Sequence, residues 1–321
     1  MTQRLEQVIA VIFAYRQQDL VEDAIRSIYS QTVFPKKLII IDDCSPDQTA
    51  SIIKKLAQAA PDGLSVETRL SQENLGLIGQ INTLKGEFEN TLLVLLAGDD
   101  IAESTRIEKL WESWKVHKLP CVIHSSYIDV DESGHLGSKH LMSESKERTF
   151  RNIVDRRIEL GGCTQTIHSD VLNKFPPIQK SVFSEDRVIV MRGALLGNLD
   201  TVNDVLLKYR INVGVSYTCR DSDSAILESE KGYLEKELGE LKQNLIDAKH
   251  VNHHSAIQLI NERIQYCEFI KRYIVSNASH STHFLKFALT ALTSIHPRYW
   301  GSLNRKRKKF RKLFANTTNT R

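Results

Sequence analysis

Short apolar runs alternate with helical patterns over the first hundred residues, and this alternation constrains the fold more than any other feature of the chain. Residues 8–15 and 38–41 are continuous runs rich in β-branched side chains, which is typical of strands buried on both faces. Two further strands are predicted at 66–70 and 91–97, and the intervening helices near 20–29 (capped by Asp19), 49–59 and 77–84. This order predicts right-handed βαβ units in a mostly parallel sheet covered by helices.

Pairs of acidic residues follow two of these strands. Asp42 and Asp43 end the second strand, and Asp99 and Asp100 follow the fourth strand after Gly98. In open α/β sheets, ligands bind beyond the carboxyl ends of the strands. We therefore expect both pairs to lie at the binding edge of the sheet.

The Gly98-Asp99-Asp100 turn has two interpretations. Adjacent carboxylates repel each other unless a cation compensates them, and oxygen ligands at a crevice suit Mn²⁺ or Mg²⁺. Seen alone, the same pair fits a helix cap beside a solvated loop acid, which is the commoner case. The surrounding pattern favours the metal site.

The other acidic pairs also have structural alternatives. Asp42 and Asp43 can stop a strand and cap the next helix, or a carboxylate here can accept from the N–H of a uracil or thymine ring. Glu185 and Asp186 can be ordinary negative charge at a helix start, or can supply a general base for a reacting hydroxyl. Spacing alone leaves both pairs open.

Six segments of the chain become informative through their order and spacing. They are VIFAY, LIIIDDCSPDQTASII, ENLGLIGQIN, LLVLLAGDDIAESTRIEKL, GGCTQTIHSDVLNKF and FSEDRVIVMRGALLG. Together they resemble the family 2 glycosyltransferases, inverting enzymes of the GT-A fold, over roughly the first two thirds of the chain. The resemblance implies a GT-A domain over residues 1–220 and a hexosyltransferase that uses a nucleoside-diphosphate sugar, with UDP-sugars favoured.

Residue roles follow from this resemblance. Contacts with the donor nucleotide are implied for Ala14, Tyr15, Asp42, Asp43, Asn74, Gly76 and Asp100. Asp99 is implied as the direct metal ligand, with Asp100 beside it. Glu185 and Asp186 match the catalytic acidic pair, in which Asp186 takes the proton from the acceptor hydroxyl while the metal neutralises charge on the leaving diphosphate.

Three positions depart from the pattern of the family. Ala97 replaces the first acid of the D-x-D region, so the ribose contact is lost or passes to Asp100. Ser71 stands where an arginine commonly precedes the Q-E-N segment, and Ala14-Tyr15-Arg16 replaces the usual Thr-Tyr-Asn. These changes bear on the choice of donor more than on the reaction.

Other classes of function have weaker support. A nucleotidyltransferase normally needs a glycine-rich phosphate loop after the first strand, and residues 14–20 contain no glycine. A dehydrogenase function is not supported either, because no G-x-G-x-x-G motif follows any predicted strand. A catalytically degenerate transferase that acts as a membrane-associated scaffold is the non-enzymatic alternative.

The pattern changes to helical repeats beyond residue 220. Apolar residues at three-four spacing from Leu227 to Ala248, and again from Ile257 to Ile274, predict a helical hairpin over residues 221–295 that turns at 252–254. A packed appendage is favoured over a homodimeric coiled coil through residues 224–274, because three heptads are near the minimum for a coiled coil.

A basic amphipathic tail is predicted over residues 296–321. From Arg298 onward there are nine Lys or Arg and no acid, so subtracting nine from the net charge of +4 leaves −5 for the rest of the chain. This distribution argues against a nucleic-acid binder, whose cations would line the folded domain. Residues 304–314 mix seven cations with Phe310, Leu313 and Phe314, which fits either an anionic membrane surface or a solvated end.

The expected location follows from several weaker features. The five cysteines form no C-x-x-C pair, no secretory signal is evident, and no apolar stretch reaches the 20 or so residues that span a bilayer. These features predict a cytoplasmic protein, peripheral on the inner face of the plasma membrane through its tail. With the resemblance, they imply a glycan or polyprenyl-diphosphate-linked acceptor in bacterial O-antigen, capsule or other surface-polysaccharide assembly.

Overall fold

The chain forms two compact units in a computed structural model that describes residues 2–116, 122–142, 148–158, 161–211, 213, 223–275, 295–306 and 308. The first unit comprises Met1–Lys180 and Glu185–Tyr217, and the second comprises Ser181–Ser184 and Thr218–Arg321. The first is an α/β domain, and the second is helical.

A single nine-stranded sheet organises the described part of the first unit. In spatial order its strands are β3 (Val66–Leu70), β2 (Phe34–Asp42), β1 (Arg4–Ala14), β4 (Leu92–Ala97), β8 (Thr166–His168), β6 (Val122–Val130), β9 (Leu199–Arg210) and β5 (Ile101–Ala102), with β7 (Leu136–His140) beside β6. The strands from β3 to β4 are mutually parallel, β8 runs antiparallel to β4 and β6, and β6 and β9 are parallel. The predicted α/β fold is confirmed.

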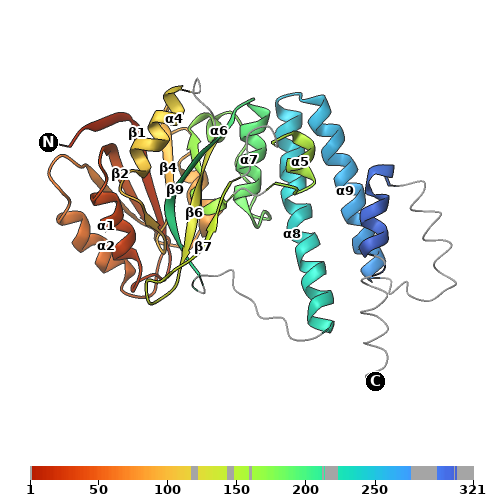
Figure 1. The fold of residues 1–321 in the computed structure, drawn as a ribbon, viewed down its shortest axis with the longest axis horizontal. Helices are drawn as coiled ribbons and strands as arrows, with labels where there is room; N and C mark the ends of the chain where they lie inside the picture. Colours follow the sequence, from red (N-terminus) through yellow and green to blue (C-terminus); the bar gives the residue numbers. More distant parts are fainter. Residues whose placement is uncertain are drawn as a thin grey trace. The chain divides into compact units, whose positions relative to one another are not determined.

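Helices cover both faces of this sheet (Figure 1), as continuous apolar strands require. Helices α1 (Val21–Tyr29) and α2 (Thr49–Gln58) lie on one side, and α7 (Glu185–Leu195) lies on the other. The remaining helices of the unit are α3 (Gly76–Thr83), α4 (Arg106–Val116), α5 (Phe150–Val154), the 3₁₀ turn η2 (Gly162–Thr164) and α6 (Asp170–Asn173).

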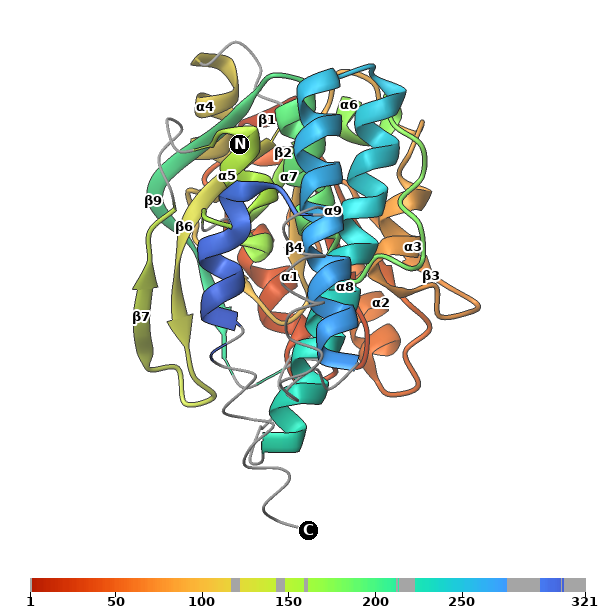
Figure 2. The ribbon, with the colours of Figure 1, turned by 90° about the vertical axis from the view of Figure 1, so that its right-hand side faces the viewer.

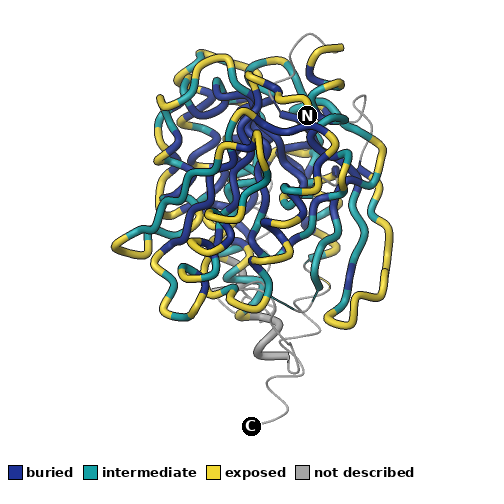
Figure 3. The backbone as a smooth tube through the Cα atoms, turned by 90° about the vertical axis from the view of Figure 1, so that its left-hand side faces the viewer, coloured by how far each residue is buried: buried dark blue, intermediate teal, exposed yellow. Residues whose placement is uncertain are grey.

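The core lies between the central strands and the first two helices. Val8 and Ile12 of β1 share one buried cluster with Ile25 and Ile28 of α1 and Ile53 of α2. Burying each of these side chains contributes about 1.5–3 kcal/mol. Figure 3 shows the strands running through the buried interior of this unit. The strands that carry the candidate site are therefore fixed by packing.

The start of α1 differs from the sequence prediction. The residue before the helix is Leu20, without a side-chain cap, so Asp19 is not the cap. The backbone carbonyl of Gln17 accepts from the N–H groups of Leu20 (3.0 Å) and Val21 (2.9 Å) instead. The loop after β1 thus closes the first turn with its own backbone, and the side chain of Gln17 hydrogen-bonds to Asp99 at the sheet edge.

The second unit contains a helical hairpin within the predicted range 221–295, of which 221–222 and 276–294 lie outside the described residues. Helices α8 (Asp223–His250) and α9 (His254–Val275) run side by side and are joined at residues 251–253 (Figure 2). Leu234 and Leu238 of α8 and Ile260 and Ile270 of α9 are buried. The three-four spacing therefore predicted most of the packed face, as expected for amphipathic helices, although Leu245, Ile257 and Ile264 of the predicted series are only half-buried.

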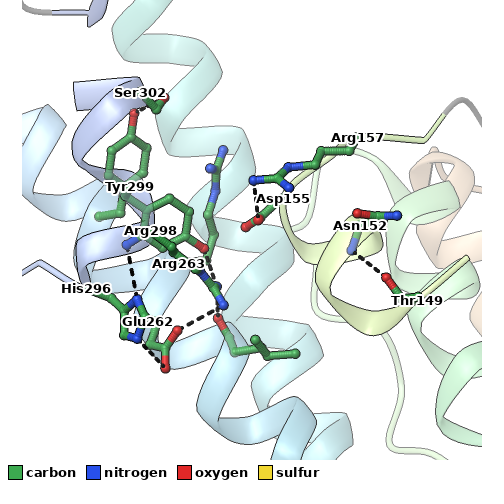
Figure 4. Close-up of polar contacts among 12 residues, drawn as sticks. Thr149, Asn152, Asp155, Arg157, Glu262, Arg263, His296, Arg298, Tyr299 and Ser302 are labelled. Atoms are coloured by element: carbon green, nitrogen blue, oxygen red, sulfur yellow. Dashed lines mark hydrogen bonds and ion pairs between the residues drawn. The ribbon is translucent and has the colours of Figure 1, made fainter. Parts of the chain in front are cut away.

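Residues 295–306 fold onto this hairpin. Tyr299, in the 3₁₀ turn η3 (Pro297–Tyr299), stacks on Tyr266 of α9 with ring centroids 4.7 Å apart. Arg263 lies over both rings and pairs with Glu237 of α8 at 2.7 Å. Figure 4 shows Arg298 directed at Glu262, and these side chains form an ion pair of 3.0 Å. The described beginning of the predicted tail is therefore folded.

Each helix within the described ranges is too short or too polar to span a membrane.

Candidate active site

The register of β1 with its neighbours brings the loops after three strands to one edge. Ala14 lies opposite Asp42 in β2, and Phe13 lies opposite Ala97 in β4. The N–H of Gly98 donates to the carbonyl of Phe13 at 2.8 Å. The residues that follow these strands therefore begin within one narrow region of the carboxyl edge.

Gly98 allows the acidic turn to approach β1. A β-carbon at this position would lie 3.2 Å from both Cβ of Ala14 and the carbonyl oxygen of Phe13, and it would overlap Oε1 of Gln17. Any larger residue would push the following two carboxylates away from the end of β1.

Asp43 holds the loop that leads into α3. Its Oδ1 accepts from Leu75 N (2.8 Å) and Gln80 Nε2 (2.5 Å), and its Oδ2 accepts from Gly76 N (2.8 Å). Asn74 Nδ2 donates to the Asp43 carbonyl at 3.1 Å. Gly76 has a φ of +71°, in the left-handed region that favours glycine. The Asp43 carboxylate is thus occupied by protein donors.

Asp42 keeps one carboxylate oxygen unpaired. Its Oδ2 accepts from Ser45 N at 3.1 Å, whereas Oδ1 is buried and has no hydrogen-bond partner among the described residues. A buried polar atom without a partner is costly, so this oxygen suits a donor supplied by a ligand. Of the two acids, Asp42 has the geometry for ligand contact.

Ala14 and Tyr15 flank the same edge. Ala14 is buried, and its carbonyl accepts from the N–H of Asp43 at 2.9 Å. Tyr15 is 42% exposed just beyond the end of β1. The predicted donor-site positions Ala14, Tyr15, Asp42, Asn74 and Gly76 therefore lie on linked segments at this edge.

Asp99 and Asp100 differ in their surroundings. Asp99 is half-buried, and burial raises the pKa of its carboxyl group against the opposing effects of Gln17 and Arg210. Asp100 is fully buried; Arg210 N donates to its Oδ1 (3.3 Å), and Oδ2 has no hydrogen-bond partner in the described parts of the chain. Burial and the charge of Asp99 raise the pKa of Asp100 to about 8.

A divalent cation fits this turn. Burial raises the pKa values of these two adjacent carboxyl groups in spite of the nearby Arg106 and Arg210, and a divalent cation would stabilise their ionised forms. No group of three or more His, Cys, Asp or Glu among the described residues makes a complete metal site. The remaining ligands would therefore come from substrate phosphates and water, as is usual for Mg²⁺. The less buried Asp99 is the side chain suited to this contact.

Two arginines that the sequence analysis missed organise the acidic turn. Arg106 is completely buried, and its Nη2 donates to the carbonyls of Leu95 (3.0 Å) and Thr164 (3.4 Å). Arg210 donates through Nη1 to the Asp99 carbonyl at 3.1 Å and pairs with Asp23 of α1. Arg106 occupies the first turn of a helix, where an arginine is normally solvated, so no local pattern marks it.

The η2 turn joins the acidic turn to Asp186. A β-carbon at Gly162 would lie 2.8 Å from Asp186 Oδ2. At the next residue, burial raises the pKa of the Cys163 thiol, and the charges of Asp100 and Asp186 raise it further. The structure thus brings two acidic pairs that are far apart in the sequence around one short turn.

Asp186 and Glu185 form the first turn of α7 and are half-buried. Burial raises the pKa of the Asp186 carboxyl group, although the charges of Arg187 and Arg156 oppose the shift. A carboxylate with a raised pKa is a stronger base and takes a proton more readily near neutral pH. The environment of Asp186 therefore suits proton transfer.

Solved structures of glycosyltransferases share this fold. The chain matches S. aureus TarS 1–349 in complex with UDP-GlcNAc with a TM-score of 0.54 and 18% identity, over 84% of this chain and 87% of TarS. It matches the mannosyltransferase PcManGT from Pyrobaculum calidifontis in complex with GDP-Man and Mn²⁺ with a TM-score of 0.50 and 13% identity, over 96% and 85% of the two chains. The fold is that of the GT-A class.

The sequence profile of glycosyl transferase family 2 matches residues 9–170, about half of the chain, and the chain belongs to this family. An uncharacterized glycosyltransferase of Haemophilus influenzae is 23% identical over 220 residues, which are 64% of this chain and 65% of the relative. The cholesterol galactosyltransferase of Borreliella burgdorferi is 28% identical over 121 residues, 38% of this chain and 33% of that protein. The chain thus spans less than two thirds of the length of these curated relatives.

Proposed function

We propose that this protein transfers a sugar, with inversion at the anomeric carbon, from a nucleoside-diphosphate sugar to a hydroxyl group of a glycan or lipid-linked acceptor. The observation that carries the proposal is the η2 turn, because Gly162 contacts Asp186 while Cys163 lies within the electrostatic influence of both Asp186 and Asp100. A base and an acidic, cation-fitting turn beside one another at a sheet edge are what single displacement at a sugar carbon requires.

The donor would lie along the carboxyl edge of β1, β2 and β4. Oδ1 of Asp42 is placed to accept from a nucleobase N–H, and Tyr15 lies exposed beside the same edge. We favour a UDP-sugar, because the imide N–H of uracil can donate a hydrogen bond to the Oδ1 atom of Asp42. The loop before α3 already donates hydrogen bonds to Asp43. This residue would therefore support the nucleotide only indirectly, by holding Asn74 and Gly76 in place.

Asp186 is the proposed base. It accepts the proton of the acceptor hydroxyl as the oxygen forms its bond to the anomeric carbon and the bond to the diphosphate breaks on the opposite face. Mn²⁺ or Mg²⁺ held at Asp99 would stabilise the charge on the departing diphosphate, with the buried Asp100 as the neighbouring residue.

A donor panel tests the reaction directly. UDP-, TDP- and GDP-sugars would be incubated with and without Mn²⁺, and the released nucleoside diphosphate would be measured. Release of diphosphate from a UDP-sugar is expected. Release of pyrophosphate would instead indicate nucleotidyl transfer, and binding without turnover of any donor would indicate a degenerate scaffold.

Replacing Asp186 by Asn tests the base. The expected result is near-normal donor binding, measured by calorimetry, and a rate of transfer lowered at least 10²-fold. Asp170→Asn is the control, because Asp170 also lies in the first turn of a helix, α6, where it pairs with Lys174 at 2.8 Å. If Asp186→Asn retained turnover, Asp186 would not be the general base.

The acceptor is proposed to reach the site at an anionic membrane, in bacterial surface-polysaccharide assembly. Of residues 304–314, Asn304, Arg305 and Lys308 are exposed and Lys306 pairs with Glu230 at 3.0 Å, while 307 and 309–314 lie outside the described residues. Trp300, one turn earlier, is 40% exposed. Vesicles containing phosphatidylglycerol should bind the full chain and not a chain truncated before Asn304. Equal binding by the two chains would show that the tail does not contribute to membrane binding.

A homodimer through residues 224–274 stays a prediction.

A further inference from the structure

A buried glutamine reaches the residue that we propose as the base. Gln165 is 3% exposed, and its Nε2 donates to the backbone carbonyl of Asp186 at 2.9 Å. This bond crosses from the end of η2 to the first turn of α7. It is therefore a tertiary contact to the backbone of Asp186 itself.

His124 of β6 fixes the orientation of this amide. The imidazole is completely buried, and its Nε2 lies 3.4 Å from Gln165 Nε2. Since the amide nitrogen carries two hydrogens, one reaches the Asp186 carbonyl and the other faces the unprotonated Nε2. Burial, with the positive charges of Arg148 and Arg187, lowers the pKa of His124 to about 3, so the ring stays a neutral acceptor.

The backbone of Gln165 is anchored to the sheet. Its N–H donates to the Gly162 carbonyl at 3.2 Å, and the next residue, Thr166, begins β8, which pairs with both β4 and β6. Arg106 ties the preceding Thr164 carbonyl to the Leu95 carbonyl of β4. Gln165, whose amide donates to the Asp186 carbonyl, is thus connected to β4, the strand that precedes Asp99.

We propose that Gln165 is a positioning residue that holds the first turn of α7, so that the carboxylate of Asp186 stays packed against Gly162 and next to the acidic turn. The inference rests on the proposed function, because it assigns Gln165 a role through Asp186 as the base. Catalytic side chains need such support from neighbouring hydrogen bonds, since small displacements cost large factors in rate.

The surroundings of Asp186 predict how loss of this support would appear. Among the described residues, the charged and titratable groups near Asp186 include Arg187 and Glu185 on its own helix, Arg156 after α5 and Cys163 of η2. His124 contacts Gln165, and Arg148 and Arg187 act on His124. Burial is the largest cause of the raised pKa of Asp186. A loosened first turn would admit water, so the pKa of Asp186 would fall toward its ordinary value.

The test compares Gln165→Leu with Gln31→Leu. Gln31 is also buried and bridges backbone groups, donating to the Ser27 and Glu103 carbonyls and accepting from Ile107 N, and none of these three hydrogen bonds reaches the η2 turn or α7. We expect Gln165→Leu to lower kcat about 10- to 100-fold with an unchanged KM for the donor. The acid limb of its pH–rate curve should move to lower pH, and that of Gln31→Leu should not move.

Gln165→Asn covers the case in which Gln165→Leu fails to fold, because it keeps the amide and shortens its reach. It should lower kcat and move the acid limb in the same direction. If either variant loses no more activity than Gln31→Leu and keeps the wild-type acid limb, the positioning role is wrong. If the wild type turns over no donor, the proposed function fails first, and this inference fails with it.

Discussion

Gly162 and Asp186 approach so closely that a β-carbon on the glycine would lie 2.8 Å from the carboxylate oxygen Oδ2 and 3.0 Å from Cβ of the aspartate. The first distance is shorter than a side-chain carbon tolerates and the second is unusually tight, so one partner must move. The η2 turn is held by Arg106 and by β8, whereas Asp186 stands at the start of a helix. A side chain at position 162 would therefore displace the aspartate.

Gly162→Ala is accordingly expected to lower kcat about 10²-fold, because a shift of about 1 Å in a reacting group has an effect of that size. Steady-state kinetics and urea unfolding would be measured together. Gly232→Ala is the control, since nothing lies within 4 Å of a β-carbon at that position in α8. An unchanged kcat in Gly162→Ala would mean that the Asp186 side chain does not need its observed position.

Arg156 should set the lower limit of the working pH range. The base acts when it is ionised, so activity falls as the pH falls through the pKa of Asp186. Burial raises that pKa, and the charge of Arg156 lowers it. Arg156→Gln removes the lowering effect, so the acid limb of kcat/KM should move to higher pH. Arg151→Gln, an exposed substitution in α5, should leave the limb unmoved.

His124 should make stability depend on pH. Its pKa is about 3 in the folded chain and about 6.5 when unfolded, so between these values the unfolded state binds the extra proton. The free energy of unfolding therefore decreases as the pH falls below about 6.5, and this decrease amounts to about 2 kcal/mol at pH 5. Urea unfolding at pH 7.5 and pH 5 should show a smaller loss in His124→Gln than in the wild type.

The control for this measurement is His254→Gln, because His254 is exposed at the start of α9. It should show the same loss of stability between the two pH values as the wild type. If His124→Gln lost as much stability between pH 7.5 and pH 5 as the wild type, groups other than His124 would cause the pH dependence.

Asp99 should govern the requirement for metal. Removing divalent ions with a chelator is expected to abolish transfer, and Mn²⁺ is expected to restore it. Asp99→Asn should raise the Mn²⁺ concentration needed for half-maximal activity by 10-fold or more, whereas Asp170→Asn should not change it. Activity of Asp99→Asn at the wild-type Mn²⁺ concentration would contradict the assignment.

Much of the first unit follows from local sequence patterns. Buried parallel strands need continuous apolar runs, and this requirement located β1, β2 and β4 to within a few residues, while the alternation of strands and helices located the half-buried β3. The hairpin of the second unit was predictable for a similar reason, because apolar residues at helical spacing mark the packed face. The acidic pairs Asp42-Asp43 and Asp99-Asp100 stood out because each lies at the end of such a run.

Strand β9 escaped prediction, since its alternation is interrupted by Asn203 and Asp204. Only its pairing with β6 and β5 makes this segment a strand. Arg210, at its end, therefore could not be connected with Asp99 and Asp100 from the sequence. Arg106 and Gln165 were missed for the same reason, because their burial depends on elements that are distant along the chain.

The sequence by itself determined the α/β class, the edge of the sheet at which a ligand would bind, and the acidic residues that could act there, because periodicity and strand ends are local properties. The tertiary structure decided which carboxylate oxygen is engaged: the α3 loop occupies the Asp43 carboxylate, whereas the buried Oδ1 of Asp42 has no hydrogen-bond partner within the described segments. It also decided that η2 places Asp186 beside the acidic turn. These outcomes depend on contacts between segments tens of residues apart, which no local pattern encodes.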